Sequence, residues 1–369
     1  MKEYYPNYFV SWLAKGTDLQ ESDLTNLEVL EPIFELNRQW VQQKEIENYT
    51  LQPDFVRAYT LFYMSMNMPK LWFLMDRGAI IPVGNEEIHF HDYGSGPGTF
   101  VWALIFYLKS KDKLKQLRSV CITEQSPVFI DQAKKLHKGL SQFLDLKHIE
   151  FTYERRDWRD SPPKQGQIAF FGNVTNELGP ELATFKVENY FDQTSEIVFL
   201  EPGTSKWFHR FLPIRNQLLQ KGWQIQFPCP QSQECPMLNS DNWCHMSINR
   251  FQHKLMQQMA GITGRRNHKH YFSAFHFSKN VKQSQSNWRM LSNIRRIKRS
   301  RVAWLCNGEK LKETVLNRRA RSECNEAFET ASIGDLLHVE RSRHQPGLPK
   351  VGRLYSGDQV TNLSNGVDD

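Results

Sequence analysis

Hydrophobic and polar positions follow two different patterns along the chain. Up to residue 84 the apolar residues recur at helical spacing, most clearly over 54–78, which predicts a helical N-terminal region. Beyond it, short apolar runs alternate with amphipathic segments. The runs that predict strands are 87–94, 119–125, 149–158, 167–178 and 196–203, and the segments that predict helices are 99–111, 126–144 and 209–222. Repeated strand-helix units favour an α/β fold with a mostly parallel sheet and helices on both faces.

The second half of the chain is less regular. We expect further strands at 223–230 and 270–280, and a hairpin over 301–319 that turns at Asn307-Gly308, since Asn-Gly suits the positive φ of a tight turn. The tail has little apolar periodicity, which predicts disorder. The expected domain ranges are 1–84 (helical), 85–228 (α/β core), 229–339 (cysteine-bearing insertion, last core strand and basic region) and 340–369 (disordered tail).

Composition and chain ends exclude several protein classes. Hydrophobic residues make up 40% and charged residues 24% of the 369 residues, which is enough apolar surface for a core. The longest apolar stretch, 100–108, is about half the ~20 residues that a membrane span requires. Near the N-terminus we find neither a secretory signal nor an Arg-rich, acid-poor mitochondrial presequence. We therefore expect a monomer in the cytoplasm, with reduced cysteines and no membrane association.

Positive charge is concentrated in one region. The net charge is +7, yet residues 250–308 alone contain thirteen Lys or Arg and no Asp or Glu. Such a one-sided distribution is typical of contact with a phosphate backbone, whereas a solvated basic face normally includes some acidic residues. The expected RNA-binding residues are Arg265, Arg266, Arg295, Arg296, Lys298, Arg299 and Arg301.

A glycine-rich loop follows the first expected strand. Its sequence gives Asp92, Gly94, Ser95, Gly96, Gly98 and Thr99, and a helix comes next. Glycine allows the backbone to turn sharply and to approach a ligand closely. The spacing resembles motif I of class I S-adenosylmethionine-dependent methyltransferases, in which the Asp and the backbone receive the methionine end. An ordinary tight turn between strand and helix is the alternative.

Polar residues at the ends of later strands extend this pattern. Glu124 ends the second strand, where an acidic residue can hydrogen-bond a ribose diol. In such folds Asp157, at the end of the third strand, would hold the adenine amine. After the fourth strand, Asn173 and Asn176 are candidates to position a base, and Glu177 is a candidate proton acceptor.

Four of the six cysteines have the spacing of a metal site. Cys229, Cys235 and Cys244 lie within sixteen residues, and Cys306 follows much later. Thiolates suit zinc or an iron–sulfur cluster. The wide first loop and the Cys-Pro pairs favour a [4Fe-4S] cluster over zinc, which stays open as the alternative. We expect Cys121 and Cys324 to be buried, metal-free thiols.

These motifs together resemble one family. DYGSGPGT, TNELG, FLEPGT, FPCPxxxxCPM…WCH and LCNG occur in the order found in the methyltransferase-like protein 17 family, the methyltransferase-like proteins associated with the mitochondrial small ribosomal subunit and their bacterial relatives. The resemblance covers roughly residues 55–337. It implies a class I methyltransferase (Rossmann-like) fold with a four-cysteine iron–sulfur site. It also implies association with small-subunit rRNA or an assembly intermediate. The first doublet continues as Cys-Pro-Gln where the family commonly has Cys-Pro-His, and the missing presequence favours a bacterial member.

Two functions remain open at this stage. One is an rRNA methyltransferase that uses S-adenosylmethionine, and the intact glycine loop favours it. The other is a non-catalytic iron–sulfur RNA-binding assembly factor for the small subunit. The second is favoured because no Asn/Asp-Pro-Pro-aromatic motif follows the fourth strand, where many amino-methylating enzymes have one.

Overall fold

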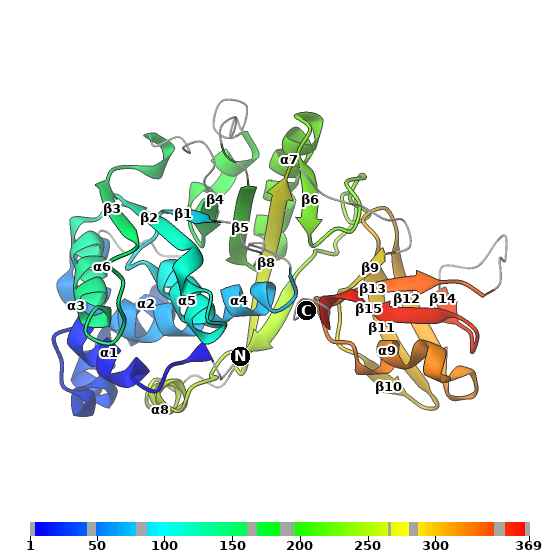
Figure 1. Ribbon diagram of the computed structural model, residues 1–369, viewed down its shortest axis with the longest axis horizontal. Helices are drawn as coiled ribbons and strands as arrows, with labels where there is room; N and C mark the ends of the chain where they lie inside the picture. The colour runs from blue at the N-terminus through cyan, green and yellow to red at the C-terminus, as the bar shows by residue number, and fades with distance from the viewer. Residues whose placement is uncertain are drawn as a thin grey trace. The chain divides into compact units, whose positions relative to one another are not determined.

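The computed structural model describes residues 4–42, 49–78, 87–160, 168–184, 194, 196–264, 267–279, 287–342 and 351–365. The chain forms two compact units (Figure 1). The first unit comprises residues 1–73, 83–174 and 248–270, and the second comprises 74–82, 175–247 and 271–369.

The first unit contains a parallel sheet and most of the helices. Strand β1 pairs in parallel with β2 and β4, and β2 pairs in parallel with β3. The strands are β1 (Ile88–Tyr93), β2 (Leu117–Glu124), β3 (Glu150–Arg155) and β4 (Ile168–Gly172). The helices are α1 (Phe9–Gly16), α2 (Leu27–Gln42), α3 (Pro53–Tyr59), α4 (Ser65–Met75, whose last residues belong to the second unit), α5 (Thr99–Ser110), α6 (Pro127–Leu140) and α8 (Lys254–Ile262).

The N-terminal helices pack directly on the helices of this sheet. Trp12 of α1 is fully buried, its ring meets Phe106 of α5 edge-on at 5.0 Å, and its Nε1 donates to the Leu136 carbonyl of α6 at 2.9 Å. A buried tryptophan contributes a large apolar area and needs such an acceptor for its N–H. Of the helical segment expected at 1–84, residues 1–73 therefore belong to the sheet unit, and the expected boundary at 84/85 lies outside the described residues.

The second unit begins after β4. It contains strands β5 (Glu196–Pro202), β6 (Gln224–Phe227), most of β8 (Lys269–Ser278) and part of β7 (Met246–Asn249), with helix α7 (Ser205–Gln220). Strand β8 runs antiparallel to both β5 and β6. Helix α7 packs on them through aromatic side chains: the Phe211 ring lies 4.7 Å from Phe199 and 4.8 Å from Phe275. The expected strands at 223–230 and 270–280 are thus confirmed.

The order of strands defines the fold class. Hydrogen bonding joins the larger sheet in the order β3-β2-β1-β4-β5-β8-β6, and β7 pairs with β8. A parallel sheet with one antiparallel strand between its last two members has the topology of class I S-adenosylmethionine-dependent methyltransferases. The order reverses between β1 and β4, and ligands of doubly wound sheets bind at the carboxyl ends of the strands at such a point.

A second sheet forms the C-terminal part of the second unit. Its order is β14-β12-β11-β9-β13-β15, and β10 pairs with β11. The strands are β9 (Asn287–Met290), β10 (Arg295–Ile297), β11 (Ser300–Cys306), β12 (Leu311–Asn317), β13 (Leu336–Glu340), β14 (Val351–Leu354) and β15 (Gln359–Asn362), and the helix is α9 (Glu326–Thr330). The expected hairpin is confirmed, because β11 and β12 pair antiparallel with Cys306 opposite Leu311.

The tail does not match the expectation of disorder. Within 340–369, strands β14 and β15 pair with β12 and β13, and Leu354 and Val360 are buried in the core of this sheet. These strands are short, so their apolar periodicity is weak, and pairing with strands from elsewhere in the chain stabilises them. The expected α/β core at 85–228 is likewise divided between the two units at residues 174/175. Among the described residues no helix is long and apolar enough to cross a membrane.

Candidate functional site

The glycine loop lies between β1 and α5, at the carboxyl end of β1. Gly94, Gly96 and Gly98 have φ values of 62°, 55° and 82°, in the left-handed region that favours glycine. A Cβ at Gly94 would lie 2.2 Å from Val174 Cγ2, and one at Gly98 would lie 2.8 Å from Trp102 Nε1. Left-handed backbone and the close approach to Val174 and Trp102 therefore require glycine at Gly94 and Gly98.

Glu124 fixes the shape of this loop. Its side chain is buried and accepts hydrogen bonds from the backbone N–H of Gly96 and of Ser126, both at 2.9 Å. Burial raises the pKa of Glu124, and these backbone donors partly oppose the increase. Each carboxylate oxygen has a second lone pair, so the residue can still accept a hydroxyl from a ligand.

Asp92 is the most unusual group of the loop. It is completely buried on β1, and neither carboxylate oxygen has a hydrogen-bond partner among the described residues. Burial raises the pKa of Asp92 well above its usual value, and the nearby Glu124 carboxylate raises it further. Burying a carboxyl group without a partner is unfavourable unless a ligand provides the donor. The site therefore fits a ligand that brings a cation or hydrogen-bond donor to Asp92.

Asp157 follows strand β3 and is engaged by a neighbour. Arg159 contacts it through Nε at 3.0 Å, through Nη2 at 2.5 Å and through its backbone N–H at 2.9 Å. These hydrogen bonds are the main reason why the pKa of Asp157 is lowered. Arg159 thus keeps the Asp157 carboxylate charged and able to accept hydrogen bonds. A contact to the adenine amine would require this form, and adenine binding by Asp157 stays a prediction.

The residues after β4 lie in different units. Asn173, in the first unit, has a φ of 58°, and buried Lys70 of α4 donates to its Oδ1 at 3.5 Å. Asn176 and Glu177 lie on the 3-10 helix η7 (Thr175–Thr184) of the second unit, so the structure does not place them relative to the glycine loop. The start of η7 is held by buried Glu201, which accepts from both the backbone N–H and the hydroxyl of Thr175 at 2.8 Å.

A polar cluster lies on the side of β1 opposite to Asp92. His91, Cys121 and Glu154 bring ligand atoms within 4.8 Å of one another. His91 Nε2 lies 2.7 Å from Thr123 Oγ1, which donates to Glu154 at 3.2 Å. We interpret this group as a hydrogen-bonded cluster within the sheet. Cys121 is buried as expected, but Cys324 is exposed, because the turn before α9 lies at the surface.

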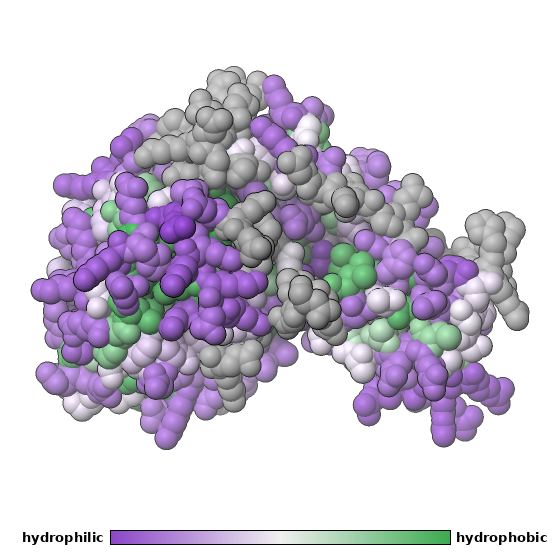
Figure 2. Space-filling model, in the orientation of Figure 1, coloured by the Kyte–Doolittle hydropathy of each residue, from purple (hydrophilic) through white to green (hydrophobic). Residues whose placement is uncertain are grey.

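The expected RNA-binding residues fall into separate parts of the structure. Arg265 and Arg266 lie outside the described residues. The other five lie on the hairpin formed by β10 and the start of β11. Arg295, Arg296, Lys298 and Arg299 are exposed there, and the surface over β10 and α9 is strongly hydrophilic (Figure 2).

The four motif cysteines come together in the second unit. Cys229, Cys235, Cys244 and Cys306 line one small cavity, whose other walls are apolar or proline side chains such as Phe208, Pro228 and Met237. Cys306 reaches it because the β11–β12 hairpin turns beside the loop after β6, where the Gly308 backbone leaves no room for a Cβ against Gln231. Residues separated by sixty-two positions in the sequence thus form one thiol cluster.

Without a ligand, burial keeps three of these thiols, those of Cys235, Cys244 and Cys306, protonated near neutral pH. Burial raises the pKa of Cys235 to about 11 and that of Cys306 to about 12, and it raises that of Cys244 well above its usual value. In each case a neighbouring cysteine of the cluster raises the pKa further. A metal ion reverses this preference, because it binds the deprotonated thiolates.

Two buried arginines border the cluster. Arg215 Nη2 lies 4.0 Å from Cys229 Sγ and donates to the Gln233 carbonyl at 2.6 Å. Arg289 donates to the carbonyl of Pro228 at 2.9 Å, and burial lowers its pKa to about 10 although Cys229 opposes the decrease. Neither arginine forms an ion pair with a carboxylate in the part of the chain that is described. Buried cations of this kind are costly unless an anionic group lies beside them.

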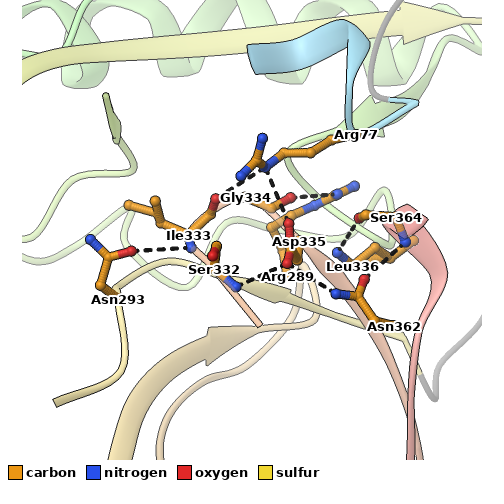
Figure 3. Close-up of polar contacts among 10 residues, drawn as sticks. All are labelled: Arg77, Arg289, Asn293, Ser332, Ile333, Gly334, Asp335, Leu336, Asn362 and Ser364. Atoms are coloured by element: carbon orange, nitrogen blue, oxygen red, sulfur yellow. Dashed lines mark hydrogen bonds and ion pairs between the residues drawn. The ribbon is translucent and has the colours of Figure 1, made fainter. Parts of the chain in front are cut away.

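Arg289 also connects the cluster to the C-terminal sheet (Figure 3). Its Nη1 donates to the Gly334 carbonyl at 3.0 Å. The next residue, Asp335, accepts from the backbone N–H of Ser332 at 2.9 Å and from Asn362 at 3.0 Å, and pairs with Arg77 at 3.2 Å. The cysteine cluster is therefore held by strand β9 and by the turn before β13.

Sequence reasoning missed Lys70, Arg215 and Arg289. Lys70 and Arg289 have one available signal, a single charged residue inside an otherwise apolar segment, as in MPKLWFLM and NWRML, whereas Arg215 lies in a helix that also contains Lys206 and Arg210. Such a residue is rarely buried without a specific partner. The partner itself cannot be deduced from the sequence, because it comes from a distant part of the chain.

The comparison with protein families gives the assignment. Residues 84–338 match the family described as mitochondrial small ribosomal subunit Rsm22. The chain belongs to the Rsm22 family. The match extends through the glycine loop and all four motif cysteines, so this Rsm22 protein contains both candidate sites within its family region. No curated protein matches the sequence.

Solved structures similar to this Rsm22 protein include several methyltransferases. Magnesium protoporphyrin IX methyltransferase from Synechocystis is 11% identical with a TM-score of 0.32, and the match covers 64% of this chain and 86% of that one. An rRNA methylase from Escherichia coli is 11% identical with a TM-score of 0.30, over 67% and 83%. The 16S rRNA methylase RmtB is 12% identical with a TM-score of 0.32, over 67% and 80%. The strand order β3-β2-β1-β4-β5-β8-β6 is the basis on which the fold is assigned to the class I methyltransferases.

Proposed function

We propose that this Rsm22 protein is an S-adenosylmethionine-dependent methyltransferase that acts on rRNA of the small ribosomal subunit. Buried Asp92, which has no hydrogen-bond partner among the described residues and lies beside the glycine loop, is the observation that carries the proposal. S-adenosylmethionine would bring an ammonium group that can donate to this carboxyl group. The family name points to the small subunit, and we propose that the chain lies within the methyltransferase-like protein 17 group of the family.

Each residue of the loop has a distinct part in this proposal. Asp92 would accept from the methionine amine, the backbone of Gly94 and Gly96 would line the cofactor, and Glu124 would keep the loop in place while accepting from the ribose. The cofactor supplies a methyl group on a sulfonium centre, open to in-line attack. The chain would then mainly hold the nucleophile in line and exclude water. Asn173, held by Lys70, is the candidate for orienting the target base.

We propose that the four cysteines hold a [4Fe-4S] cluster, with zinc as the alternative. Four thiolates around either metal group give a net charge of −2, which would balance the two cations of Arg215 and Arg289. The apolar cavity and closed ligand set suit a group that stabilises the fold and is shielded from solvent. Elemental analysis and Mössbauer spectroscopy of protein purified without oxygen distinguish iron from zinc.

A non-catalytic assembly factor is the second candidate. The hydrogen bonds at the start of η7 favour this second candidate. Glu201 accepts from Thr175, and Trp207 Nε1 donates to its hydroxyl, so these groups are engaged within the protein where methyltransferases commonly have a base-binding motif. In this case S-adenosylmethionine and the metal group would stabilise an RNA-binding protein that assists subunit assembly.

Methyl transfer to rRNA separates the two candidates. Small subunits from cells that lack the protein are incubated with tritiated S-adenosylmethionine and the wild type, Asp92→Asn, or Asp131→Asn, an exposed control on α6. Label in rRNA with the wild type and the control, but not with Asp92→Asn, supports the enzyme. Absence of label, with subunit binding intact, supports the assembly factor.

A further inference from the structure

The C-terminal sheet has the topology of a known nucleic-acid-binding fold. Its pairs β9–β11, β11–β12, β9–β13 and β13–β15 are antiparallel, whereas β12–β14 is parallel. These pairings require β14 and β15 to run in the same direction. They are consecutive in the chain, separated only by the turn at Tyr355–Asp358, where Asp358 accepts the Tyr355 N–H at 3.0 Å. Together they form one bent fifth strand.

This bent strand closes a five-stranded barrel. In order of the chain the five strands are β9, β11, β12, β13 and β14–β15, and the short helix α9 lies between the third and the fourth. The spatial order is therefore 1-2-3-5-4-1. That is the oligonucleotide/oligosaccharide-binding (OB) fold, which binds its ligands on the face of strands 2 and 3. Met290, Leu305, Leu316, Leu337 and Leu354 share one buried core, with one residue from each strand.

Basic residues from two segments meet at one end of strands 2 and 3. Arg295, Arg296, Lys298 and Arg299 lie on the β10–β11 hairpin, and Arg318 and Arg319 follow β12. The two segments are adjacent, because the Arg318 N–H donates to the Arg299 carbonyl at 2.8 Å. All six side chains are exposed. Only Arg295 has an ion pair with a described residue, to Glu313 at 2.6 Å.

Apolar side chains are exposed beside these cations. Trp304, on strand 2 of the barrel, is 38% exposed, and Ile297 of β10 is 45% exposed. Trp304 lies opposite Glu313, whose carboxylate pairs with Arg295, so the indole and Arg295 share a face. Aromatic rings next to a positive groove are the elements on which single-stranded nucleic acids stack their bases.

We infer that this barrel, residues 287–342 and 351–365, binds a single-stranded segment of RNA across strands β11 and β12. The β10–β11 hairpin and the residues after β12 contact the phosphates, and Trp304 stacks on a base. Glu323 and Glu326, next to and on α9, are exposed carboxylates that would repel phosphates, so the proposed RNA path avoids the helix. The inference rests on the proposed function in one respect, that the partner is RNA. It adds the surface that binds the RNA and the expectation that the bound segment is single-stranded.

Fluorescence anisotropy with the full chain tests this inference. The probes are a labelled single-stranded RNA of about 12 nucleotides, within the site size of OB folds, and the same sequence as a duplex. The test variant is Arg296→Ala/Lys298→Ala/Arg299→Ala. The control, Lys109→Ala/Lys115→Ala/Lys138→Ala, removes the same charge from exposed lysines of the first unit.

The expected results distinguish single-stranded from duplex RNA and the barrel surface from the rest of the protein. The single strand binds at least tenfold more tightly than the duplex. The test variant lowers the slope of log affinity against log salt by about 2, since each cation lost contributes roughly 0.7 with single strands. The control leaves the slope unchanged. Trp304→Ala weakens binding about fivefold or more, while Trp304→Phe keeps most of it.

Three outcomes overturn the inference: equal affinity for duplex, equal loss in the control variant, or equally strong displacement of the RNA by polyglutamate, which indicates an acidic protein partner. Circular dichroism shows that each variant is folded. The assay contains no S-adenosylmethionine, and Asp92→Asn should bind the single strand like the wild type. Failure of RNA binding is therefore distinguishable from failure of the proposed methyl transfer.

Discussion

At the scale of single residues, the candidate sites consist of groups that are unfavourable by themselves. Asp92 is a buried carboxyl group to which no described residue hydrogen-bonds, and the loop beside it uses left-handed backbone at Gly94. Arg215 and Arg289 are buried cations next to thiols. Such groups persist in a fold when a ligand compensates them, so their substitution should affect the free and the ligand-bound protein differently.

Asp92→Asn should stabilise the ligand-free protein at neutral pH. Folding raises the pKa of this carboxyl group above its unfolded value of about 3.9, so the ionised form opposes folding. The opposition is absent below the unfolded pKa and grows as pH rises toward the folded pKa. Thermal unfolding should show a higher Tm for the variant at pH 7.5 and no difference near pH 3.5. A lower Tm at both pH values, or an equal gain in Asp131→Asn, would contradict the assignment.

Gly94→Ala should destabilise the protein by about 2–4 kcal/mol, because the new Cβ combines left-handed strain with overlap against Val174. Gly222→Ala is the matched control, since it has a φ of 85° but open space around the Cβ. Gly222→Ala should destabilise the protein by only about 1 kcal/mol, because left-handed backbone strain is its single unfavourable contribution. Urea unfolding measures both. Equal losses of unfolding free energy in the two variants would mean that Val174 can move away from the new Cβ at little cost.

At the scale of elements, the cysteine cluster is made by a hairpin and a loop. Cys306 lies at the end of β11, and its Sγ accepts the Gly308 N–H at 3.4 Å. The other three cysteines lie in the segment between β6 and β7. Gly308 approaches the backbone of Gln231, and Arg289 donates to the Pro228 carbonyl, so a metal group held by all four cysteines would add to these connections between the hairpin and the segment.

Cys306→Ser should lower metal content and thermal stability together, because an open site binds metal more weakly and the hairpin loses its link to the loop. Cys324→Ser is the control, since this thiol is exposed. Inductively coupled plasma mass spectrometry and differential scanning calorimetry on the same samples measure both quantities. A variant that retains all of its metal would remove Cys306 from the ligand set.

Arg289→Met should lower the Tm of the metal-loaded protein more than that of the metal-free protein. In both states the variant loses hydrogen bonds to Pro228 and Gly334, but only the loaded state also loses compensation of a −2 charge. Arg289→Lys, which keeps the charge, should lie between the wild type and Arg289→Met. Equal decreases with and without metal would indicate a purely structural arginine.

At the scale of the whole molecule, the two candidate ligand sites belong to different units. The glycine loop with Asp92 and Glu124 lies in the first unit, and all four motif cysteines lie in the second. The basic stretch that is continuous in the sequence is also divided, because Arg250 and Lys254 belong to the first unit and the β10–β11 hairpin to the second.

Removal of the metal should therefore loosen one part of the molecule. Hydrogen exchange after chelation should increase in 229–249 and 300–317, where the cysteine ligands lie, and should stay unchanged over 87–124. Addition of S-adenosylmethionine to the same sample should slow exchange at 92–98. Increased exchange over 87–124 upon chelation would show that the metal group stabilises the cofactor loop as well.

The sequence by itself determined those features that depend on local spacing. The strand-helix alternation gave the parallel sheet, Asn307-Gly308 gave the hairpin, and Gly94, Gly96 and Gly98 marked a loop whose backbone needs positive φ. These follow from interactions between residues close in the chain. Cys229, Cys235 and Cys244 were also recognisable as a group because they are near neighbours.

Only the tertiary structure decided what depends on distant partners. The buried state of Asp92, the two arginines beside the thiols and the pairing of β14 with β12 all involve residues far apart in sequence. The tail that looked disordered completes a barrel, because strands of four residues gain their stability from pairing and a shared core and show little periodicity of their own. The same barrel brings Arg318 next to Arg299, which turns two separate basic segments into one surface.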